Sequence, residues 1–349
     1  MPSFRDLLGV ELPIIQAPMA GVQGSALAIA VSNAGGLGSL PCAMLSAEAM
    51  HDELTAITSA TRKPFNVNFF CHTPPVPDPE REAAWRALLR PYYVEAGLDI
   101  DRVPAGPGRT PFSHEHIDVL TRFKPPVVSF HFGLPGQDLL ERVRALGATI
   151  LSSATTVEEA RWLNERGVDA IIAQGLEAGG HRGTFLSHEL TTQIGTLALV
   201  PQIVNAVGVP VIAAGGIADS SGVAAALALG AAAVQIGTAY MLCPEATTSA
   251  VHRAALKSHA ARHTALTNVF TGRPARGIVN RLIREIGPMS SLAPEFPLAT
   301  AAIAPLRGAA EAQGSGDFSP LWSGQNPSGC RDVPAATLTV ELVPGIVQQ

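Results

Sequence analysis

Apolar residues along the chain gather in short runs, and each run is followed by a turn and then by a helical pattern. Because strands that are covered on both faces read as continuous apolar segments, these runs predict buried strands. Eight strands are expected, at residues 13–17, 36–40, 64–70, 126–132, 148–152, 169–174, 210–214 and 232–236.

The segments between these runs repeat apolar residues at helical spacing, which predicts crossover helices. The expected helices cover residues 24–34, 46–59, 114–123, 136–145, 156–166, 197–206 and 219–229. Strands that alternate with helices predict a parallel sheet. Eight such units predict an α/β fold of the (β/α)8 TIM-barrel class.

Two regions break this alternation. Residues 71–113 form an insertion after the third strand, Pro-rich at both ends, with a helix expected at 80–96. Residues 245–349 follow the eighth strand and predict a mostly helical C-terminal extension. We therefore expect a barrel over 1–244, insertion included, and a helical region over 245–349 that caps it. Insertions of this length are commonly functional lids.

Composition and charge narrow the classes of partner. The 349 residues are 47% hydrophobic and 15% charged, which suits one large core. The net charge is −5 and no run of Lys or Arg stands out, so we expect no nucleic-acid partner. The four cysteines lie far apart and form no C-x-x-C pair, which argues against a disulfide framework and fits a reducing cytoplasm. Assembly into a homo-oligomer stays open.

One apolar stretch, residues 223–242, is almost long enough to cross a bilayer. Gly230, Gln235 and Gly237 divide it into a short helix and a buried strand. The N-terminus has no basic segment followed by an apolar one, so no secretion signal is expected. We predict no association with a membrane.

Glycines follow the last two predicted strands, as Gly215-Gly216 and Gly237-Thr238. At the carboxyl ends of the seventh and eighth strands of such barrels, main-chain N–H groups commonly bind a phosphate. The alternative is that these glycines only permit tight turns. Because two such turns follow adjacent strands, we favour a phosphate site.

The sixth strand runs into AQGLEAGGHRG, a loop too long and too glycine-rich for a minimal turn. Gln174 ends the strand, and Gly179-Gly180 would let main-chain amides approach a flat ring or its phosphate tail. His181 and Arg182 are weaker catalytic candidates, since a His and an Arg in an exposed loop are more often solvated.

Several motifs together resemble the nitronate monooxygenase family, formerly called 2-nitropropane dioxygenases. They are PIIQAPMAGVQGSALAIAVSNAGGLGSL, FNVNFF, SFHFGLP, AQGLEAGGHRG, GGIADSSGVAAALALGAAAVQIGTAY and TGRPARG, and they span nearly the whole chain. The likeness is greatest to the bacterial class I members. It implies an FMN-dependent barrel enzyme that oxidises alkyl nitronates, including propionate 3-nitronate, without a nicotinamide cofactor.

The resemblance also implies which residues bind FMN. Residues of the QAPMAG motif would line the flavin ring, Asn68 would bond its polar edge or tail, the AQGLEAGGHRG loop would hold the middle of the cofactor, and the last two turns would receive the phosphate. The full implied set is Ala17, Pro18, Met19, Asn68, Gln174, Gly179, Gly180, Gly215, Gly216, Gln235, Gly237 and Thr238.

His131 is the candidate catalytic residue. It ends the fourth predicted strand in VSFHFGLP, where the barrel places active sites. Its imidazole could donate a hydrogen bond to the nitronate oxygens or take the α-proton of a neutral nitroalkane. The alternative is a structural histidine that bonds a neighbouring carbonyl. The position at the strand end and the HFG motif favour catalysis.

Other polar residues are weaker candidates. His114 and His116 lie on different faces of a helix start and have no third ligand, so no metal site is predicted. Asp219 is expected to cap a helix. Tyr240 is either a substrate contact or a packing residue. The LWSGQ segment, with Trp322, resembles one near the cofactor in the family but receives no role.

The sequence therefore favours an FMN enzyme that converts a nitronate and dioxygen to a carbonyl compound and nitrite, a detoxification reaction. One alternative is an FMN-dependent NAD(P)H:quinone or enoyl-thioester reductase. Another is a flavin-free barrel lyase or isomerase that acts on a phosphorylated metabolite, because a phosphate site alone does not separate a cofactor from a substrate.

Overall fold

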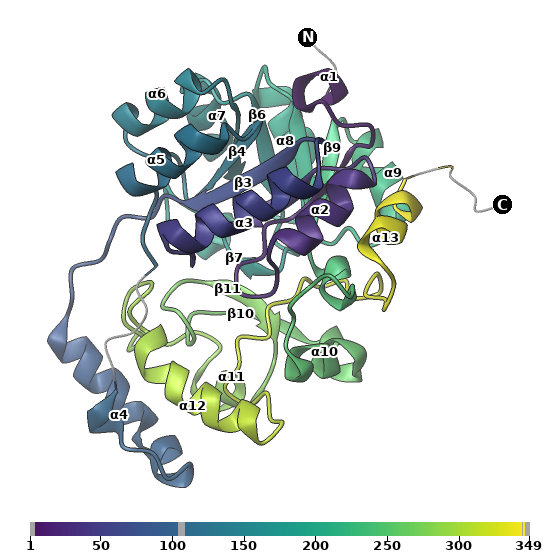
Figure 1. The fold of residues 1–349 in the computed structure, drawn as a ribbon. Helices are drawn as coiled ribbons and strands as arrows, with labels where there is room; N and C mark the ends of the chain where they lie inside the picture. The colour runs from purple at the N-terminus through teal and green to yellow at the C-terminus, as the bar shows by residue number, and fades with distance from the viewer. Residues whose placement is uncertain (1–3, 104–108, 344, 346–349) are drawn as a thin grey trace.

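Eight parallel strands form the centre of the molecule, and helices surround them (Figure 1). The computed structural model describes residues 4–103, 109–343 and 345. The strand order is β1-β9-β8-β6-β5-β4-β3-β2, and a bridge between Ile15 and Leu37 joins β1 to β2 and closes the barrel. The barrel strands are β1 (Ile14–Gln16), β2 (Gly38–Pro41), β3 (Phe65–Phe70), β4 (Val127–His131), β5 (Thr149–Ala154), β6 (Ala170–Gln174), β8 (Val211–Ala214) and β9 (Ala233–Ile236).

The predicted TIM barrel is thus confirmed, and each expected helix is present close to its expected ends. These helices are α2 (Ser25–Asn33), α3 (Ala47–Ala60), α4 (Pro79–Glu95), α5 (His114–Phe123), α6 (Gln137–Ala145), α7 (Val157–Glu165), α8 (Thr196–Ala206) and α9 (Ser220–Ala228).

Local sequence explains where these helices begin and which face they bury. The Ser46 side chain accepts from an N–H group in the first turn of α3 and so satisfies a donor that the helix leaves unpaired. Within α3, Met50, Leu54 and Ile57 recur at helical spacing and are fully buried. Asp219 caps α9 as expected, because its Oδ1 accepts from the Gly222 N–H at 2.8 Å.

Apolar side chains fill the barrel at the amino ends of its strands. The short helix α1 (Phe4–Leu8) contributes Phe4 and Leu8 to a buried cluster that also holds Ile15, Val127 and Ile212. These side chains fill the amino end of the barrel. Any ligand site inside the barrel therefore has to lie at the carboxyl ends of the strands, as the fold class predicts.

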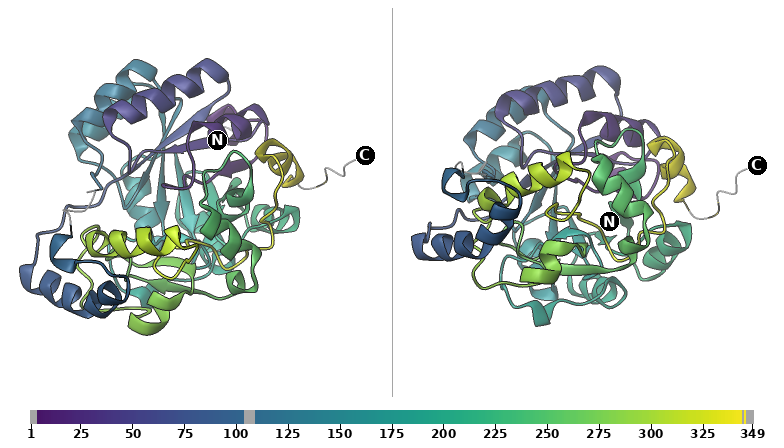
Figure 2. Two further views of the ribbon diagram at one scale, coloured as in Figure 1. Left: turned by 60° about the horizontal axis from the view of Figure 1, so that its bottom comes forward. Right: turned by 90° about the horizontal axis from the view of Figure 1, so that it is seen from below.

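The insertion and the C-terminal region pack on one another beyond those carboxyl ends (Figures 1 and 2). Trp85 and Tyr93 of α4 share a buried cluster with Phe270 and with Ile303 of α12 (Thr300–Ala312). The Tyr93 hydroxyl donates to the Ala302 carbonyl at 2.7 Å. Residues 104–108 of the insertion lie outside the described residues. The two additions form one apolar unit.

A small antiparallel sheet in this unit was not expected from the sequence. Strands β10 (Thr264–Thr267) and β11 (Ala275–Ile278) pair with each other, and β11 also pairs with β7 (Gly180–His181). The C-terminal region is therefore not helical throughout, although it also holds α10 (Ala250–Lys257) and α11 (Arg281–Ile286). The sheet ties the AQGLEAGGHRG loop to the C-terminal region.

The last helix, α13 (Ala335–Glu341), returns to the barrel and packs against α2 (Figure 1). The Tyr240 hydroxyl lies 2.9 Å from Thr339 Oγ1 in this contact. The division of the chain into two domains at residue 244 stays a prediction. Beyond that residue, α13 packs on a helix of the barrel.

The apolar stretch 223–242 is divided as expected into the end of α9, the strand β9 and a 3-10 turn (Thr238–Leu242). None of the helices in the described residues has both the length and the apolar character to span a membrane.

Candidate active site

One cavity opens at the carboxyl ends of the barrel strands. Its volume is about 200 Å³. A cavity that holds one water molecule has a volume of roughly 10–15 Å³, so this cavity is large enough for a sizeable ligand. All thirteen residues that the sequence assigned to a site line it: Ala17, Pro18, Met19, Asn68, His131, Gln174, Gly179, Gly180, Gly215, Gly216, Gln235, Gly237 and Thr238. The structure thus brings the candidates together; their roles stay predictions.

The loops after β8 and β9 form one end of the cavity, which we call the glycine end (Gly215, Gly216, Gly237, Thr238). Gly215 and Gly216 have φ values of +118° and +72°, a region that favours glycine. No described residue accepts a hydrogen bond from the main-chain N–H of Gly216 or Gly237. Donors without partners at a cavity wall are suited to an anion.

A C-terminal segment, residues 322–330, crosses the glycine end. The Gly324 N–H donates to Thr238 Oγ1 at 2.9 Å, and Asn326 Nδ2 donates to the Gly216 carbonyl at 3.0 Å. A Cβ at Gly179 would come within 2.5 Å of the Gly324 nitrogen, so the AQGLEAGGHRG loop also touches this segment. Trp322 and Gly324 of the LWSGQ segment therefore belong to the cavity wall.

Amide side chains in the cavity wall differ in their hydrogen bonding. Gln235 Oε1 is buried and has no hydrogen-bond partner among the described residues, so it is free to accept from a ligand. Gln174 is engaged at both ends, because Nε2 donates to the His181 carbonyl and Oε1 accepts from the Gly183 N–H. Asn68 donates to Ser129 Oγ at 2.9 Å.

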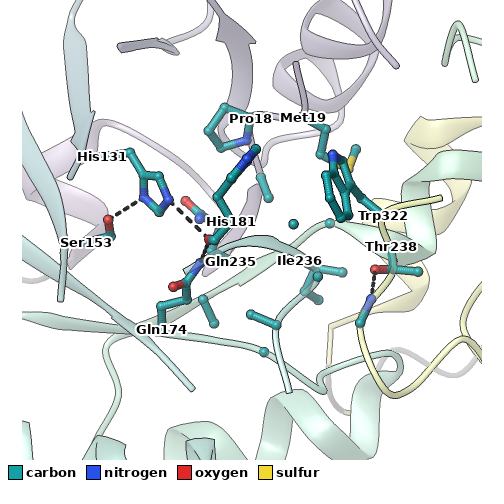
Figure 3. A pocket seen from close by; sticks show the side chains of 18 of the residues that line it. Pro18, Met19, His131, Ser153, Gln174, His181, Gln235, Ile236, Thr238 and Trp322 are labelled. Carbon is teal, nitrogen blue, oxygen red and sulfur yellow. Dashed lines mark hydrogen bonds between the residues drawn. The ribbon is translucent and has the colours of Figure 1, made fainter. Parts of the chain in front are cut away.

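His131 lies on the opposite side of the cavity from Thr238 (Figure 3). Its Nε2 is 3.3 Å from the His181 carbonyl and its Nδ1 is 2.6 Å from Ser153 Oγ. A carbonyl only accepts, so Nε2 carries the proton and Nδ1 accepts from the serine hydroxyl. The two contacts select one neutral tautomer, in which Nε2–H donates to the His181 carbonyl.

The electrostatic surroundings keep this histidine neutral. Burial, with a smaller effect from the positive charge of Arg273, lowers the pKa of His131 to about 3. Burial and the charges of Arg109 and Arg273 also hold the pKa of His181 well below its ordinary value. Both imidazoles are therefore uncharged at neutral pH.

The AQGLEAGGHRG loop is not the solvated loop that we expected around His181 and Arg182. Arg182 is fully buried and donates to Gln193 Oε1 and to the Gln174 and Gly175 carbonyls. It holds the loop and is absent from the cavity wall. His181 does line the cavity, and its Nε2 is 2.9 Å from Thr271 Oγ1.

Sequence reasoning missed several residues of the wall. Ser153, which holds His131, lies within β5 and is marked by no local motif, and Arg109 comes from the insertion. Aromatic side chains also line the cavity. Of these, the sequence analysis named only Trp322, without a role. The unassigned wall residues include Phe70, Arg109, Phe130, Ser153, Met241, Trp322, Gly324 and Asn326. The strands β10 and β11 lie next to the cavity in the C-terminal region. In the sequence, only the TGRPARG motif, which overlaps β11, pointed to them.

The remaining candidates lie away from the cavity. The Tyr240 side chain is fully buried and is a packing residue. His116 Nδ1 accepts from the Ser113 N–H at the start of α5 and so has a structural role. Among the described residues, no group of three His, Cys, Asp or Glu side chains is arranged to hold a metal.

Comparison with known proteins places these features in one family. Residues 2–347 match the family model described as nitronate monooxygenase. A nitronate monooxygenase of Pseudomonas aeruginosa is 44% identical over 97% of each chain. One of Paraburkholderia phytofirmans is 42% identical over 97% of this chain and 93% of its own.

Among solved structures, a nitroalkane oxidase from Streptomyces ansochromogenes superposes with a TM-score of 0.89 and 39% identity. The match covers 98% of this chain and 96% of the other. The motifs, the barrel and the length of these matches agree: the chain belongs to the nitronate monooxygenase family.

Proposed function

We propose that this chain is an FMN-dependent enzyme that oxidises alkyl nitronates, such as propionate 3-nitronate, with dioxygen to a carbonyl compound and nitrite. Membership of the family supports the reaction. The observation that carries the proposal is the cavity itself, which has unpaired main-chain N–H groups at one end and, at the other, a neutral imidazole whose Nε2–H makes only a long contact with a carbonyl.

The residues of the cavity fit FMN. The free N–H groups of Gly216 and Gly237 would bind the phosphate, and the unpartnered Gln235 Oε1 would accept a hydrogen bond from the ring system. Pro18 and Met19 form the wall opposite Gln174 (Figure 3) and would contact the flat ring. When bound, FMN supplies the redox chemistry of the reaction.

We assign His131 the role of a hydrogen-bond donor to the nitronate oxygens. Its Nδ1 already accepts from Ser153, and its pKa of about 3 makes it a poor base for the α-proton of a nitroalkane. Its Nε2–H makes only a long contact of 3.3 Å with the His181 carbonyl. An anionic oxygen would be a stronger acceptor for that proton.

The rest of the wall excludes water and favours an anion. Phe70, Phe130 and Trp322 line the cavity, and no Asp or Glu side chain does so among the described residues. A nitronate carries the negative charge that a neutral nitroalkane lacks. The chain's own residues therefore select the ionised substrate and hold it away from solvent.

The test is an aerobic assay of purified protein with and without added FMN. We expect a bound flavin spectrum, and nitrite released in proportion to the nitronate consumed, with no requirement for NADH or NADPH. Rapid NAD(P)H oxidation with a quinone or an enoyl thioester, in place of nitrite release, would favour the reductase alternative. Protein that binds no flavin would favour a lyase or isomerase.

A cytoplasmic location and a role in detoxification are part of the proposal. The four cysteines are all free thiols, as is usual in a reducing compartment. Nitronates are reactive anions, and their conversion to a carbonyl compound and nitrite removes them. Small molecules would then be the partners of this site.

A further inference from the structure

We propose that Arg109 determines substrate preference by pairing with a carboxylate at the far end of the nitronate from its reacting carbon. The inference rests on the proposed function and goes beyond it, because it names the side chain that binds the end of the substrate far from the reacting carbon. It assigns the 71–113 insertion a direct part in binding.

Arg109 lines the cavity, and its guanidinium has no hydrogen-bond or carboxylate partner in the part of the chain that the structure describes; its recorded contact there is with the Phe296 ring. Its Nη1 is fully buried without a hydrogen bond, and no described carboxylate pairs with the group. A buried, unpaired charge is costly, so such groups normally have a partner. The missing partner is an anion that the cavity receives.

Other buried or half-buried arginines of this chain have hydrogen-bond partners. Arg182 donates from all three guanidinium nitrogens, and Arg253 donates to four main-chain carbonyls. Arg273 stacks on the Phe132 ring at 3.8 Å and donates to the Thr184 carbonyl. Arg273 Nε is also buried without a partner, but Arg109 differs from all three because none of its guanidinium nitrogens has a hydrogen-bond partner among the described residues.

The surroundings of Arg109 are apolar, and the group stays charged in them. Its guanidinium carbon is 5.3 Å from the centre of the Phe296 ring, and that ring is 5.1 Å from the His181 ring. Burial lowers the pKa of Arg109 to about 10, which leaves the group charged at neutral pH. An apolar, acid-free wall around a cation raises the strength of any ion pair formed there.

Arg109 and His131 form two separate anion-binding positions. Arg109 comes from the insertion and contacts the Phe296 ring, whereas His131 ends β4 and is bonded to Ser153 and to the His181 carbonyl. A nitronate with an uncharged tail places a negative charge only at the position of His131. A nitronate that also carries a carboxylate satisfies both, and a planar carboxylate matches the guanidinium fork.

The experiment compares propionate 3-nitronate with butyl nitronate in the FMN-loaded wild type, Arg109→Met and Arg109→Lys. We expect Arg109→Met to lower kcat/KM for propionate 3-nitronate by about 10- to 100-fold, mainly through KM, and to change butyl nitronate less than about threefold. Arg109→Lys should recover part of the loss. Arg102→Met is the matched control, because Arg102 lies on the same insertion and its side chain is 87% exposed.

A binding measurement without turnover accompanies the kinetics. A carboxylate has the planar shape and charge of a nitronate, so succinate mimics the doubly charged substrate and butyrate the singly charged one. By calorimetry, wild-type holoenzyme should bind succinate at least tenfold more tightly than butyrate, and Arg109→Met should abolish the difference. Flavin content should be equal in all variants.

Three results would overturn the inference. Equal losses on both nitronates would place Arg109 at the reacting group, loss of flavin in Arg109→Met would place it at the cofactor, and no change would make it structural. If wild-type holoenzyme oxidises neither nitronate, the proposed function fails, and the succinate and butyrate titrations still decide the inference about Arg109.

Discussion

The two ends of the cavity are built in different ways. The glycine end consists of main-chain groups from two adjacent loops, after β8 and β9. The opposite end, which we call the histidine end (His131, Ser153, His181 and Arg109), consists of side chains from β4, β5, β7 and the insertion. The first end offers donors to any phosphate, whereas the second presents a defined tautomer and an unpaired cation. Cofactor binding and substrate choice are therefore separable.

The largest effect should follow from a change at the histidine end. We predict that His131→Asn keeps bound FMN and lowers kcat/KM by about 100- to 1000-fold, because the donor to the nitronate is lost. The loss should be equal on the preformed nitronate and on the neutral nitroalkane, measured by oxygen uptake. A much greater loss on the neutral form would instead make His131 a base.

A change at the glycine end should act on the cofactor. Gly237→Val would place methyl groups beside Ala17 and the Met19 sulfur, each only 3.4 Å from a Cβ at this position. We expect FMN affinity to fall about 10- to 100-fold, measured by fluorescence titration of apoprotein. Gly308→Ala, where a Cβ meets nothing within 4 Å, is the control. Unchanged FMN affinity in Gly237→Val would contradict the assignment of this end.

A smaller effect should come from the residue that positions His131. Ser153→Ala removes the hydroxyl that donates to Nδ1, so only the longer contact of Nε2 with the His181 carbonyl still selects the useful tautomer. We predict a loss of about 3- to 10-fold in kcat with little change in flavin affinity. The neighbouring Ser152 bonds the Gly133 carbonyl instead, so Ser152→Ala should leave kcat unchanged. Equal effects of the two substitutions would argue against a specific role for Ser153.

The smallest effect concerns stability in acid. Burial lowers the pKa of His252 to about 4, and in the unfolded chain its pKa is about 6.5. The unfolded state therefore binds more protons below pH 6.5, so this contribution to stability is complete above that pH and is lost toward pH 4. We expect wild type to lose about 2 kcal/mol more than His252→Gln between pH 7 and pH 5. Urea unfolding at both pH values measures it, and parallel losses would refute it.

The glycine end could be predicted from the sequence because its signals are local. Gly215-Gly216 and Gly237-Thr238 each follow an apolar run, and the resemblance to the family covers the same positions. The barrel strands could also be predicted from the sequence, since each is a short apolar segment. These features depend on the main chain and on neighbours in sequence.

The histidine end could be predicted only in part, because its side chains meet through tertiary contacts. His131 was found at a strand end, yet its partner Ser153 is 22 residues away. Arg109 carried no signal within a Pro-rich insertion. Arg182 was expected in solvent, but the sheet formed by β7, β10 and β11 encloses its loop. Short strands that pair across distant segments leave little pattern in the sequence.

Anaerobic mixing of the FMN-loaded protein with a nitronate tests the central claim most directly, namely that this cavity holds flavin and nitronate together. The account predicts that the visible absorbance of the flavin is bleached, and that admitting dioxygen restores it with release of nitrite. A flavin spectrum that stays unchanged with several nitronates, while NADH or NADPH bleaches it, would contradict the account.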